Sequence, residues 1–165
     1  MRYVSTRGGV EPIDFSQAVL MGLADDGGLL IPESIPDCSD RLSDWADLPY
    51  PALAYEVMRL FNTSLPEAGL RAMIDAAYGE PFDPEVAPVA CVGDLYILEL
   101  WHGPTLAFKD VALQLLGRLF EHILAGRGGP DGELNILAAT SGDTGSAAIH
   151  GVRGRRGLRI FVMHP

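Results

Sequence analysis

Lys109 lies in the stretch HGPTLAFKD, residues 102–110, immediately ahead of a long run of apolar residues at helical spacing. Leu106 and Phe108 give the local sequence an apolar character, and removing a lysine from water lowers the pKa of its ammonium group. An amine with a lowered pKa is the nucleophile that Schiff-base chemistry requires. The Gly-Pro pair near the start of the stretch forms a turn that fixes where the side chain emerges. The alternative is a solvated lysine with no part in chemistry.

The glycine-rich segment TSGDTG, residues 140–145, is the second feature suited to chemistry. It lies between an apolar run of strand length and the start of a short helix, where backbone N–H groups and the helix dipole favour an anion. Ser141 and Thr144 add hydroxyl donors, while Gly142 and Gly145 let the backbone approach a ligand closely. The spacing fits neither a Walker A loop nor the GxGxxG of dinucleotide-binding proteins. A plain strand-to-helix turn capped by serine or aspartate is the alternative.

These two features suit a single cofactor if both follow strands of one sheet. In open α/β sheets, ligands bind beyond the carboxyl ends of the strands, so Lys109 and the TSGDTG segment would then lie at one edge. A lysine beside a site for an anion fits a cofactor such as pyridoxal phosphate.

The second half of the chain has the alternation of strands and helices that places such loops at one sheet edge. The expected elements are a strand at 95–101, a helix at 109–126, a mobile connection at 126–133, a strand at 134–140, a short helix after TSGDTG and a strand at 158–163. Because these strands are apolar on nearly every residue, they are expected to pair in parallel with both faces covered. The sequence therefore predicts an α/β fold in which residues 134–163 form a β-α-β unit.

The first half of the chain has the pattern of a helical unit. Three helices are predicted, over residues 15–24, 51–61 and 66–79. Asp14 or Ser16 could cap the first of them. The segment EPFDPEVAP, residues 80–88, carries three prolines in nine residues, which is typical of a linker or a domain edge. We therefore expect a helical N-terminal domain, residues 1–80, and the first part of an α/β domain, residues 81–165.

Composition disfavours several classes of protein. The net charge is −10, and nucleic-acid binding needs a basic surface, so nucleic acid is not expected as the main partner. No apolar run approaches the length of a membrane span, and the start MRYVSTRGG lacks the apolar segment of a signal peptide. A cytoplasmic protein with no membrane partner is therefore expected. Cys38 and Cys91 lack metal-ligand spacing, as do the histidines, and no metal site is predicted.

Two histidines near these features have competing interpretations. His102 opens the lysine stretch, and it either faces a substrate or is held by hydrogen bonds in the turn. His150 lies in the short helix after TSGDTG, where a structural role is favoured.

Four segments, in this order, resemble the pattern of one family: YVSTRGG, FSQAVLMGLADDGGLLIPE, ELWHGPTLAFKD and AATSGDTGSAA. The family is that of the threonine synthases, pyridoxal-phosphate enzymes of the tryptophan-synthase-β-like fold, and the resemblance covers nearly the whole chain. It implies that Lys109 is the catalytic residue and forms the covalent link to pyridoxal phosphate. It also implies a loop for the substrate's α-carboxylate, with Asp143 placed at the cofactor as well: Ser141, Gly142, Asp143, Thr144 and Gly145.

The reaction implied by the resemblance converts O-phospho-L-homoserine and water to L-threonine and phosphate, with Lys109 as the proton shuttle. The expected partner is therefore a small molecule, and the oligomeric state stays open. Family members are considerably longer, and their loop for the cofactor's phosphate and their partner of the pyridine nitrogen lie further along. We therefore expect the chain to be a fragment that is inactive by itself.

Two other functions compete with this interpretation. A catalytically silent remnant could serve as a binding or assembly module, and the missing phosphate loop favours it for this polypeptide alone. The intact lysine stretch and TSGDTG segment favour the enzyme for the complete protein. A related β-replacement enzyme acting on another amino acid is disfavoured by the STRG segment, residues 5–8.

Overall fold

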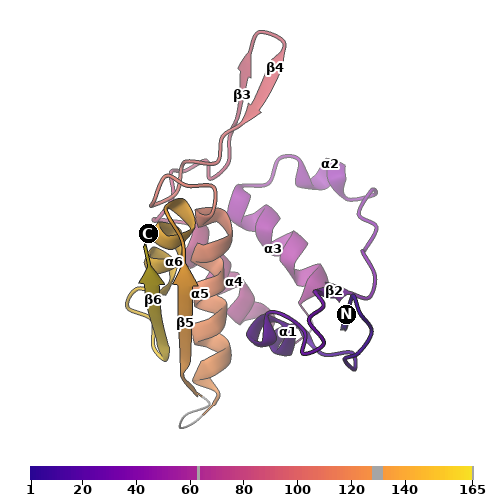
Figure 1. The fold of residues 1–165 in the computed structure, drawn as a ribbon. Helices are drawn as coiled ribbons and strands as arrows, with labels where there is room; N and C mark the ends of the chain where they lie inside the picture. The colour runs from indigo at the N-terminus through magenta and orange to yellow at the C-terminus, as the bar shows by residue number, and fades with distance from the viewer. Residues whose placement is uncertain (63, 128–131, 165) are drawn as a thin grey trace. The chain divides into compact units, whose positions relative to one another are not determined.

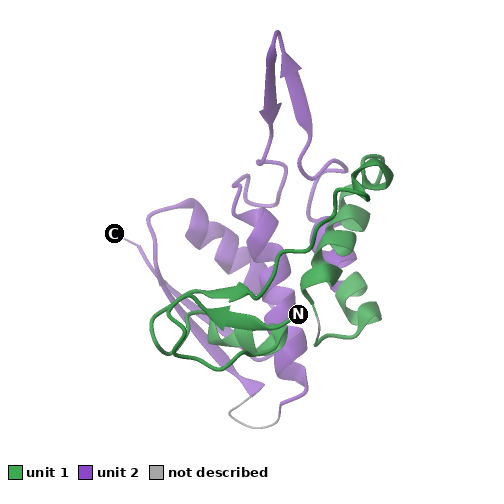
Figure 2. Cartoon of the chain, turned by 90° about the vertical axis from the view of Figure 1, so that its right-hand side faces the viewer, with its two compact units in different colours: residues 1–72 green, residues 73–165 purple. Residues whose placement is uncertain are grey.

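The structure is a computed structural model of the 165-residue chain, and it describes residues 1–62, 64–127 and 132–164. The predicted connection at 126–133 therefore lies partly outside the described residues. The chain divides into two compact units, residues 1–72 and 73–165 (Figure 2). The division falls within helix α4 (Glu67–Tyr78), and domain limits of 1–80 and 81–165 remain a prediction. No described helix has the length and apolar character needed to cross a bilayer.

The helices of the first unit lie where the sequence predicts them. They are α1 (Phe15–Met21), α3 (Tyr50–Phe61) and the start of α4, with a short, unexpected α2 (Leu42–Trp45). Asp14 is the cap of α1, because its carboxylate accepts the Gln17 N–H at 2.9 Å while the Gln17 side chain accepts the Asp14 N–H at 3.0 Å. Strands β1 (Tyr3–Ser5) and β2 (Leu30–Pro32) form an antiparallel pair. Strands of three residues are too short to show an alternating pattern in the sequence.

Asp26 joins the STRG segment to the loop before β2. Its carboxylate accepts hydrogen bonds from the Ser5 hydroxyl at 2.7 and 2.8 Å, the Gly28 N–H at 2.8 Å and the Gly9 N–H at 2.7 Å. The Arg7 guanidinium donates to the Asp26 carbonyl at 3.1 Å. The hydrogen bonds from Ser5 and Gly28 hold the pKa of the Asp26 carboxyl below its ordinary value of 3.8.

Acid should therefore destabilise the first unit through Asp26. A carboxyl group whose pKa is lower in the folded state stabilises the fold fully above its unfolded pKa, near 3.8, and the contribution disappears as the pH falls through the folded value. Between about pH 5 and about pH 2, the thermal midpoint should fall more steeply for the wild-type protein than for Asp26→Asn. Asp25→Asn, at an exposed neighbouring residue, is the matched control. Parallel curves for the wild type and Asp26→Asn would contradict this role.

The second unit holds the β-α-β arrangement that the sequence predicts. Helix α5 (Asp110–Ala125) is followed by β5 (Leu134–Ala139), α6 (Asp143–Val152) and β6 (Leu158–Met163). Strands β5 and β6 pair in parallel, from Leu134 opposite Leu158 to Ala139 opposite Met163. The α/β fold class is confirmed. Figure 1 shows α5 beside these strands, beginning at the end of the unit where β5 ends.

The prediction for residues 95–101 is wrong in its pairing. A strand of the parallel sheet was expected, but β4 (Leu95–Leu98) pairs antiparallel with β3 (Val89–Val92) in a hairpin. The two-residue turn Gly93–Asp94 between apolar runs is the sequence signal for a hairpin, and Gly93 has the positive φ of 61° that such a turn uses. The hairpin stands away from the rest of its unit (Figure 2) and exposes the apolar side chains of Val89, Val92, Leu95, Tyr96, Ile97 and Leu98. The lysine stretch therefore does not follow a strand of the β5–β6 sheet.

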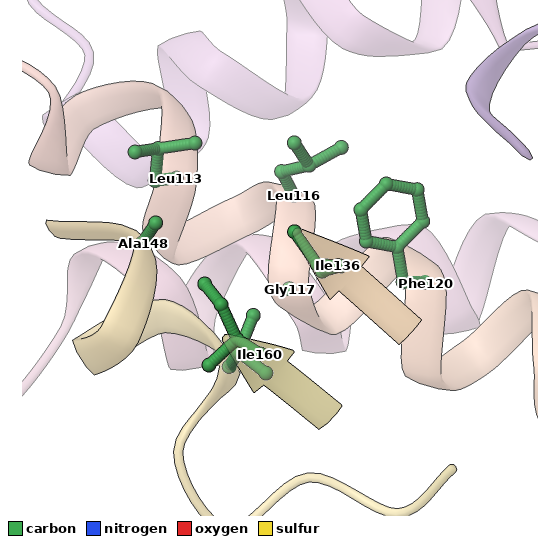
Figure 3. Close-up of a pocket in the computed structure, with 8 residues that line it drawn as sticks. Leu113, Leu116, Gly117, Phe120, Ile136, Ala148 and Ile160 are labelled. Carbon is green, nitrogen blue, oxygen red and sulfur yellow. The ribbon is translucent and has the colours of Figure 1, made fainter. Parts of the chain in front are cut away.

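Helices α5 and α6 touch backbone to backbone. A Cβ atom on Gly117 would lie 2.1 Å from the Gly151 carbonyl oxygen, and one on Gly151 would lie 2.4 Å from the Leu113 carbonyl oxygen. Because no side chain fits in this space, both positions require glycine. An apolar pocket of about 240 Å³ adjoins the contact (Figure 3), lined by Leu113, Leu116, Gly117, Phe120, Ile136, Ala148, Val152 and Ile160.

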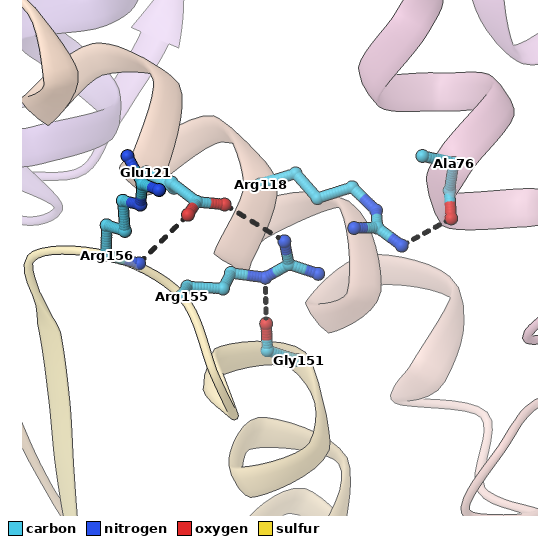
Figure 4. Close-up of polar contacts among 6 residues, drawn as sticks. All are labelled: Ala76, Arg118, Glu121, Gly151, Arg155 and Arg156. Carbon is cyan, nitrogen blue, oxygen red and sulfur yellow. Dashed lines mark hydrogen bonds and ion pairs between the residues drawn. The ribbon is translucent and has the colours of Figure 1, made fainter.

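Glu121 ties the loop after α6 to α5 (Figure 4). Its carboxylate accepts hydrogen bonds from Arg155 Nη1 at 3.2 Å and from the Arg156 N–H at 2.9 Å. Arg118, one turn earlier on α5, donates to the Ala76 carbonyl near the end of α4. Burial and the nearby charge of Arg155 lower the pKa of the Arg118 guanidinium. Through these contacts α5 is bonded both to the end of α4 and to the loop after α6.

Candidate active site

The segment that carries Lys109 is a tight loop in front of α5. The Leu106 N–H donates to the Gly103 carbonyl at 3.1 Å, and the Asp110 N–H donates to the Ala107 carbonyl at 2.9 Å. Leu106 has a φ of 58°, in the left-handed region that costs a residue with a side chain roughly 1–2 kcal/mol. A leucine persists there only when its surroundings constrain it, and such constraint is common at functional sites.

Asp110 provides much of this constraint. Its fully buried carboxylate accepts hydrogen bonds from the Thr105 N–H at 2.8 Å, the Thr105 hydroxyl at 2.9 Å and the Gln114 side-chain amide at 2.9 Å. Gly103 passes so close that a Cβ atom there would lie 2.6 Å from the Asp110 Cβ. Lys109 is thus held between a closed loop and the first turn of α5. Sequence reasoning missed Asp110 in this role, although an acidic residue in the first helical turn is a recognisable signal.

The amine of Lys109 is available to a ligand. The side chain is half-buried, Nζ lies 4.8 Å from the centre of the Phe108 ring, and within the described residues the amine makes no hydrogen bond or ion pair. The apolar neighbours expected to shield it are themselves exposed, Leu106 by 75% and Phe108 by 56%. Of these two side chains, Phe108 is the one that lies against the amine.

The TSGDTG segment follows β5 directly and opens α6. Ser141, Asp143 and Thr144 are exposed, and their side chains have no hydrogen-bond partner in the part of the chain that the structure describes. No described acceptor takes the N–H of Asp143 or of Thr144. Two hydroxyls and two N–H groups at the start of a helix are therefore free to receive an anion. An open pocket of about 370 Å³ adjoins them, lined by Ala139, Thr140, Ser141, Met163 and His164.

The two glycines of this turn have different surroundings. Gly142 has no atom within 4 Å of a hypothetical Cβ, whereas a Cβ on Gly145 would lie 2.7 Å from Thr140 Cγ2. The Gly145 N–H also donates to the Gly142 carbonyl at 2.9 Å, so it is not free for a ligand. Gly145 therefore serves the packing of α6, and Gly142 lies on the open side of the turn.

Gln114 connects the lysine loop to the helix that TSGDTG opens. Its side-chain amide donates to the Asp110 carboxylate at 2.9 Å and to the Ala147 carbonyl at 3.4 Å. Its oxygen lies 2.9 Å from His150 Nδ1, which gives His150 the structural role that the sequence favours. Because α5 begins and β5 ends at one end of the unit (Figure 1), the loop before α5 and the turn after β5 lie at that same end.

His102 is held in its turn by hydrogen bonds to two acids, Asp83 and Glu99, rather than left free. Hydrogen bonds to these two carboxylates raise the pKa of the imidazole above its ordinary value of 6.5. Across residues 1–62, 64–127 and 132–164, no group of three His, Cys, Asp or Glu side chains is arranged to hold a metal ion.

Comparison with known proteins gives one consistent result. The model of the family "Threonine synthase N terminus" matches residues 2–78. The threonine synthase of Pseudomonas aeruginosa is 48% identical over 168 residues, covering 100% of this chain and 35% of the relative, and that of Saccharomyces cerevisiae is 44% identical over 99% of this chain and 35% of its own length. This chain thus spans about a third of the length of the curated relatives that it matches.

Comparison with solved structures also finds threonine synthases. A threonine synthase from Brucella melitensis, solved with pyridoxal phosphate bound, superposes with a TM-score of 0.92 at 42% identity, over 100% of this chain and 36% of that one. The yeast threonine synthase superposes with a TM-score of 0.90 at 43% identity, over 99% of this chain and 35% of that one.

Proposed function

Because this chain corresponds over its whole length to the N-terminal third of threonine synthases, in sequence and in fold, we propose that it is the N-terminal part of a pyridoxal-phosphate-dependent threonine synthase. The complete enzyme would convert O-phospho-L-homoserine and water to L-threonine and phosphate. The observation that carries the proposal is the superposition of the entire chain on a threonine synthase that holds pyridoxal phosphate. Residues 1–80 would form its helical N-terminal domain, and residues 81–165 would begin the domain that binds the cofactor.

Lys109 is the residue that we assign to the cofactor and to catalysis. It is the only lysine among the 165 residues, and its amine has no competing carboxylate within the described residues. When bound, pyridoxal phosphate supplies the electron sink that stabilises negative charge on the substrate's carbon atoms. Lys109 would hold the cofactor before the substrate arrives and would then move protons at the α- and β-carbons. The constrained loop in front of α5 keeps the amine in one place for both tasks.

The turn after β5 is the site that we assign to the substrate's α-carboxylate. The hydroxyls of Ser141 and Thr144, together with the free N–H groups of Asp143 and Thr144, would donate hydrogen bonds to it. Asp143 is exposed, and its own carboxylate would face the cofactor. Gly142 would leave the turn open to the ligand, and Gly145 would allow α6 to pack closely against Thr140.

Removing one hydroxyl should weaken this carboxylate site measurably. Thr144→Val keeps the shape of the side chain and removes its donor, so it should weaken substrate binding by roughly 1–3 kcal/mol. The measurement is the affinity of the full-length enzyme for O-phospho-L-homoserine. Thr144→Ser, which retains the hydroxyl, is the matched control and should bind more tightly than Thr144→Val. Equal affinities for Thr144→Val and the wild type would count strongly against the assignment.

Partners and location follow from the same proposal. The substrate is a small molecule, the enzyme would act in the cytoplasm, and a chain with a net charge of −10 is not suited to nucleic acid. The described residues supply the amine and the donors for the substrate's carboxylate, but the chain spans only about a third of the relatives' length. We therefore expect residues 1–165 alone to be inactive.

The competing function, a silent binding or assembly module, predicts a different outcome for the complete protein. A threonine synthase should restore growth to a threonine-requiring bacterial strain and release phosphate from O-phospho-L-homoserine when pyridoxal phosphate is supplied. A silent module should do neither, and the cofactor should then fail to bind at Lys109.

A further inference from the structure

Both nitrogens of the His102 imidazole are hydrogen-bonded to carboxylates. Asp83 Oδ2 lies 2.9 Å from Nδ1, and Glu99 Oε2 lies 2.7 Å from Nε2. The Trp101 ring stacks on the imidazole, with centroids 5.8 Å apart and planes inclined by 24°. The Asp83 N–H also donates to the His102 carbonyl at 3.0 Å, so residue 83 holds both the side chain and the backbone of His102.

This geometry selects the protonated ring. A neutral imidazole has one donor and one acceptor nitrogen, so it would satisfy one carboxylate and turn a lone pair toward the other. The imidazolium donates to both. Within the described residues, Asp83 and Glu99 are the titratable groups that face the ring, and their hydrogen bonds raise the pKa of His102 above 6.5. The clamp formed by these three residues is therefore ionic when the imidazole carries both of its protons.

The clamp stands at the entrance to the lysine loop. His102 directly precedes Gly103, the residue whose carbonyl closes the first turn of that loop. A Cβ atom on Gly103 would lie 2.8 Å from Phe82 Cε1, so the loop entrance packs on the residue next to Asp83. The same short segment thus contacts both His102 and Gly103.

A residue that packs on this segment, Tyr78, reaches the other end of the loop. The Phe82 ring packs edge-on against Tyr78, with centroids 5.8 Å apart. The Tyr78 hydroxyl donates to the Val111 carbonyl in the first turn of α5 at 2.8 Å. Because Lys109 lies between Gly103 and Val111, residues 78–83 contact both ends of the loop that carries the amine, with Phe82 at Gly103 and Tyr78 at Val111.

We propose that His102, Asp83 and Glu99 form an ionic clamp that positions the Lys109 amine by fixing the chain where its loop begins. The inference rests on the proposed role of Lys109 in the complete enzyme. His102 is a positioning residue, since its contacts are with Asp83, Glu99 and Trp101 rather than with the amine. The clamp loosens as the pH rises past the raised pKa of His102, because the neutral ring holds one carboxylate instead of two.

The decisive variant is His102→Gln in the full-length enzyme. It removes the charge, so kcat should fall about 10- to 10²-fold, the size of loss that a misplaced reacting group produces, while KM for the substrate changes little. The wild-type enzyme should lose kcat on the alkaline side as His102 titrates, and His102→Gln should lack this alkaline loss.

Glu99→Gln keeps the imidazole and removes one carboxylate, so it should shift the alkaline loss of kcat to lower pH. His122→Gln, at an exposed histidine of α5, is the matched control and should match the wild type.

A second measurement is independent of activity. The enzyme is treated with an amine-reactive acetylating reagent in the absence of cofactor, and the Lys109 peptide is followed by mass spectrometry. The rate of labelling reports how accessible and reactive the Lys109 amine is. Its labelling rate should change in His102→Gln and stay unchanged in His122→Gln. If both the labelling rate and the alkaline loss of kcat are the same in His102→Gln as in the wild type, the clamp has no positioning role.

Failure of the clamp can be told apart from failure of the proposed function. Borohydride reduction of the wild-type enzyme with pyridoxal phosphate tests the function first, because a label on a lysine other than Lys109 ends that assignment before any variant is made. If His102→Gln does not fold, Asp83→Asn and Glu99→Gln decide the matter; the Asp83 side chain is 68% exposed and tolerates the change. An alkaline loss of kcat that moves in neither variant overturns the clamp.

Discussion

Lys109→Ala should leave the complete protein folded, unable to bind pyridoxal phosphate covalently, and slower by roughly 10²–10⁴-fold or more. The amine makes no hydrogen bond or ion pair within the described residues, and the Phe108 ring beside it is an exposed side chain, so its removal should leave the loop closed. The loop is closed instead by Asp110 with Thr105 and by the Leu106 N–H. Three measurements check this result: the absorbance of the bound cofactor, the thermal midpoint without cofactor, and the release of phosphate from the substrate.

Lys109→Arg provides the sharper control for this result. It keeps a positive charge at the same position, but a guanidinium is always protonated and cannot act as the nucleophile. Arginine should therefore fail as completely as alanine if the amine itself is needed. If Lys109→Arg retained activity, charge alone would be the contribution of this residue, and the assignment to the cofactor would be wrong.

Gly117→Ala should destabilise the second unit by about 3 kcal/mol, at the upper end of the usual cost of overpacking. The added methyl group would lie 2.1 Å from the Gly151 carbonyl oxygen, and that atom belongs to backbone, which cannot rotate away. Helices α5 and α6 would have to separate. Urea unfolding of the wild type and the variant measures the difference.

Gly126→Ala is the matched control, at the end of the same helix. Gly126 has a φ of −82°, which alanine adopts without strain, and no atom lies within 4 Å of its hypothetical Cβ. Its stability should equal that of the wild type or exceed it by a few tenths of a kcal/mol. Equal losses in Gly117→Ala and Gly126→Ala would show that the close helix contact does not limit stability.

Periodic spacing predicted the elements that are long and amphipathic. Helix α5 follows from apolar residues such as Val111, Leu115 and Leu119, and β5 and β6 follow from apolar runs of strand length. The pairing of β4 did not follow, because an apolar run looks the same in a buried parallel strand and in an exposed hairpin. The Gly93–Asp94 turn was the local signal that distinguishes them.

The candidate site was predictable in its reactive groups and not in the groups that hold them. Lys109 and the TSGDTG hydroxyls are recognisable because their types and order carry chemistry. Asp110 is a common residue at the start of a helix, and its burial under Thr105 and Gln114 depends on how the chain folds back. The carboxylates that grip His102 lie 19 and 3 residues away in the sequence, and no local pattern brings them together.

The bridge made by Gln114 has a consequence for the thermodynamics of ligand binding. Gln114 joins Asp110 on α5 to Ala147 and His150 on α6, and at Gly117 and Gly151 the backbones of the two helices approach closely. The loop that carries Lys109 and the turn after β5 are therefore linked through these hydrogen bonds before any ligand arrives. A molecule that engages both therefore has to order only their free side chains, such as those of Lys109, Ser141 and Thr144, at a cost of about 0.5–1.5 kcal/mol for each one immobilised.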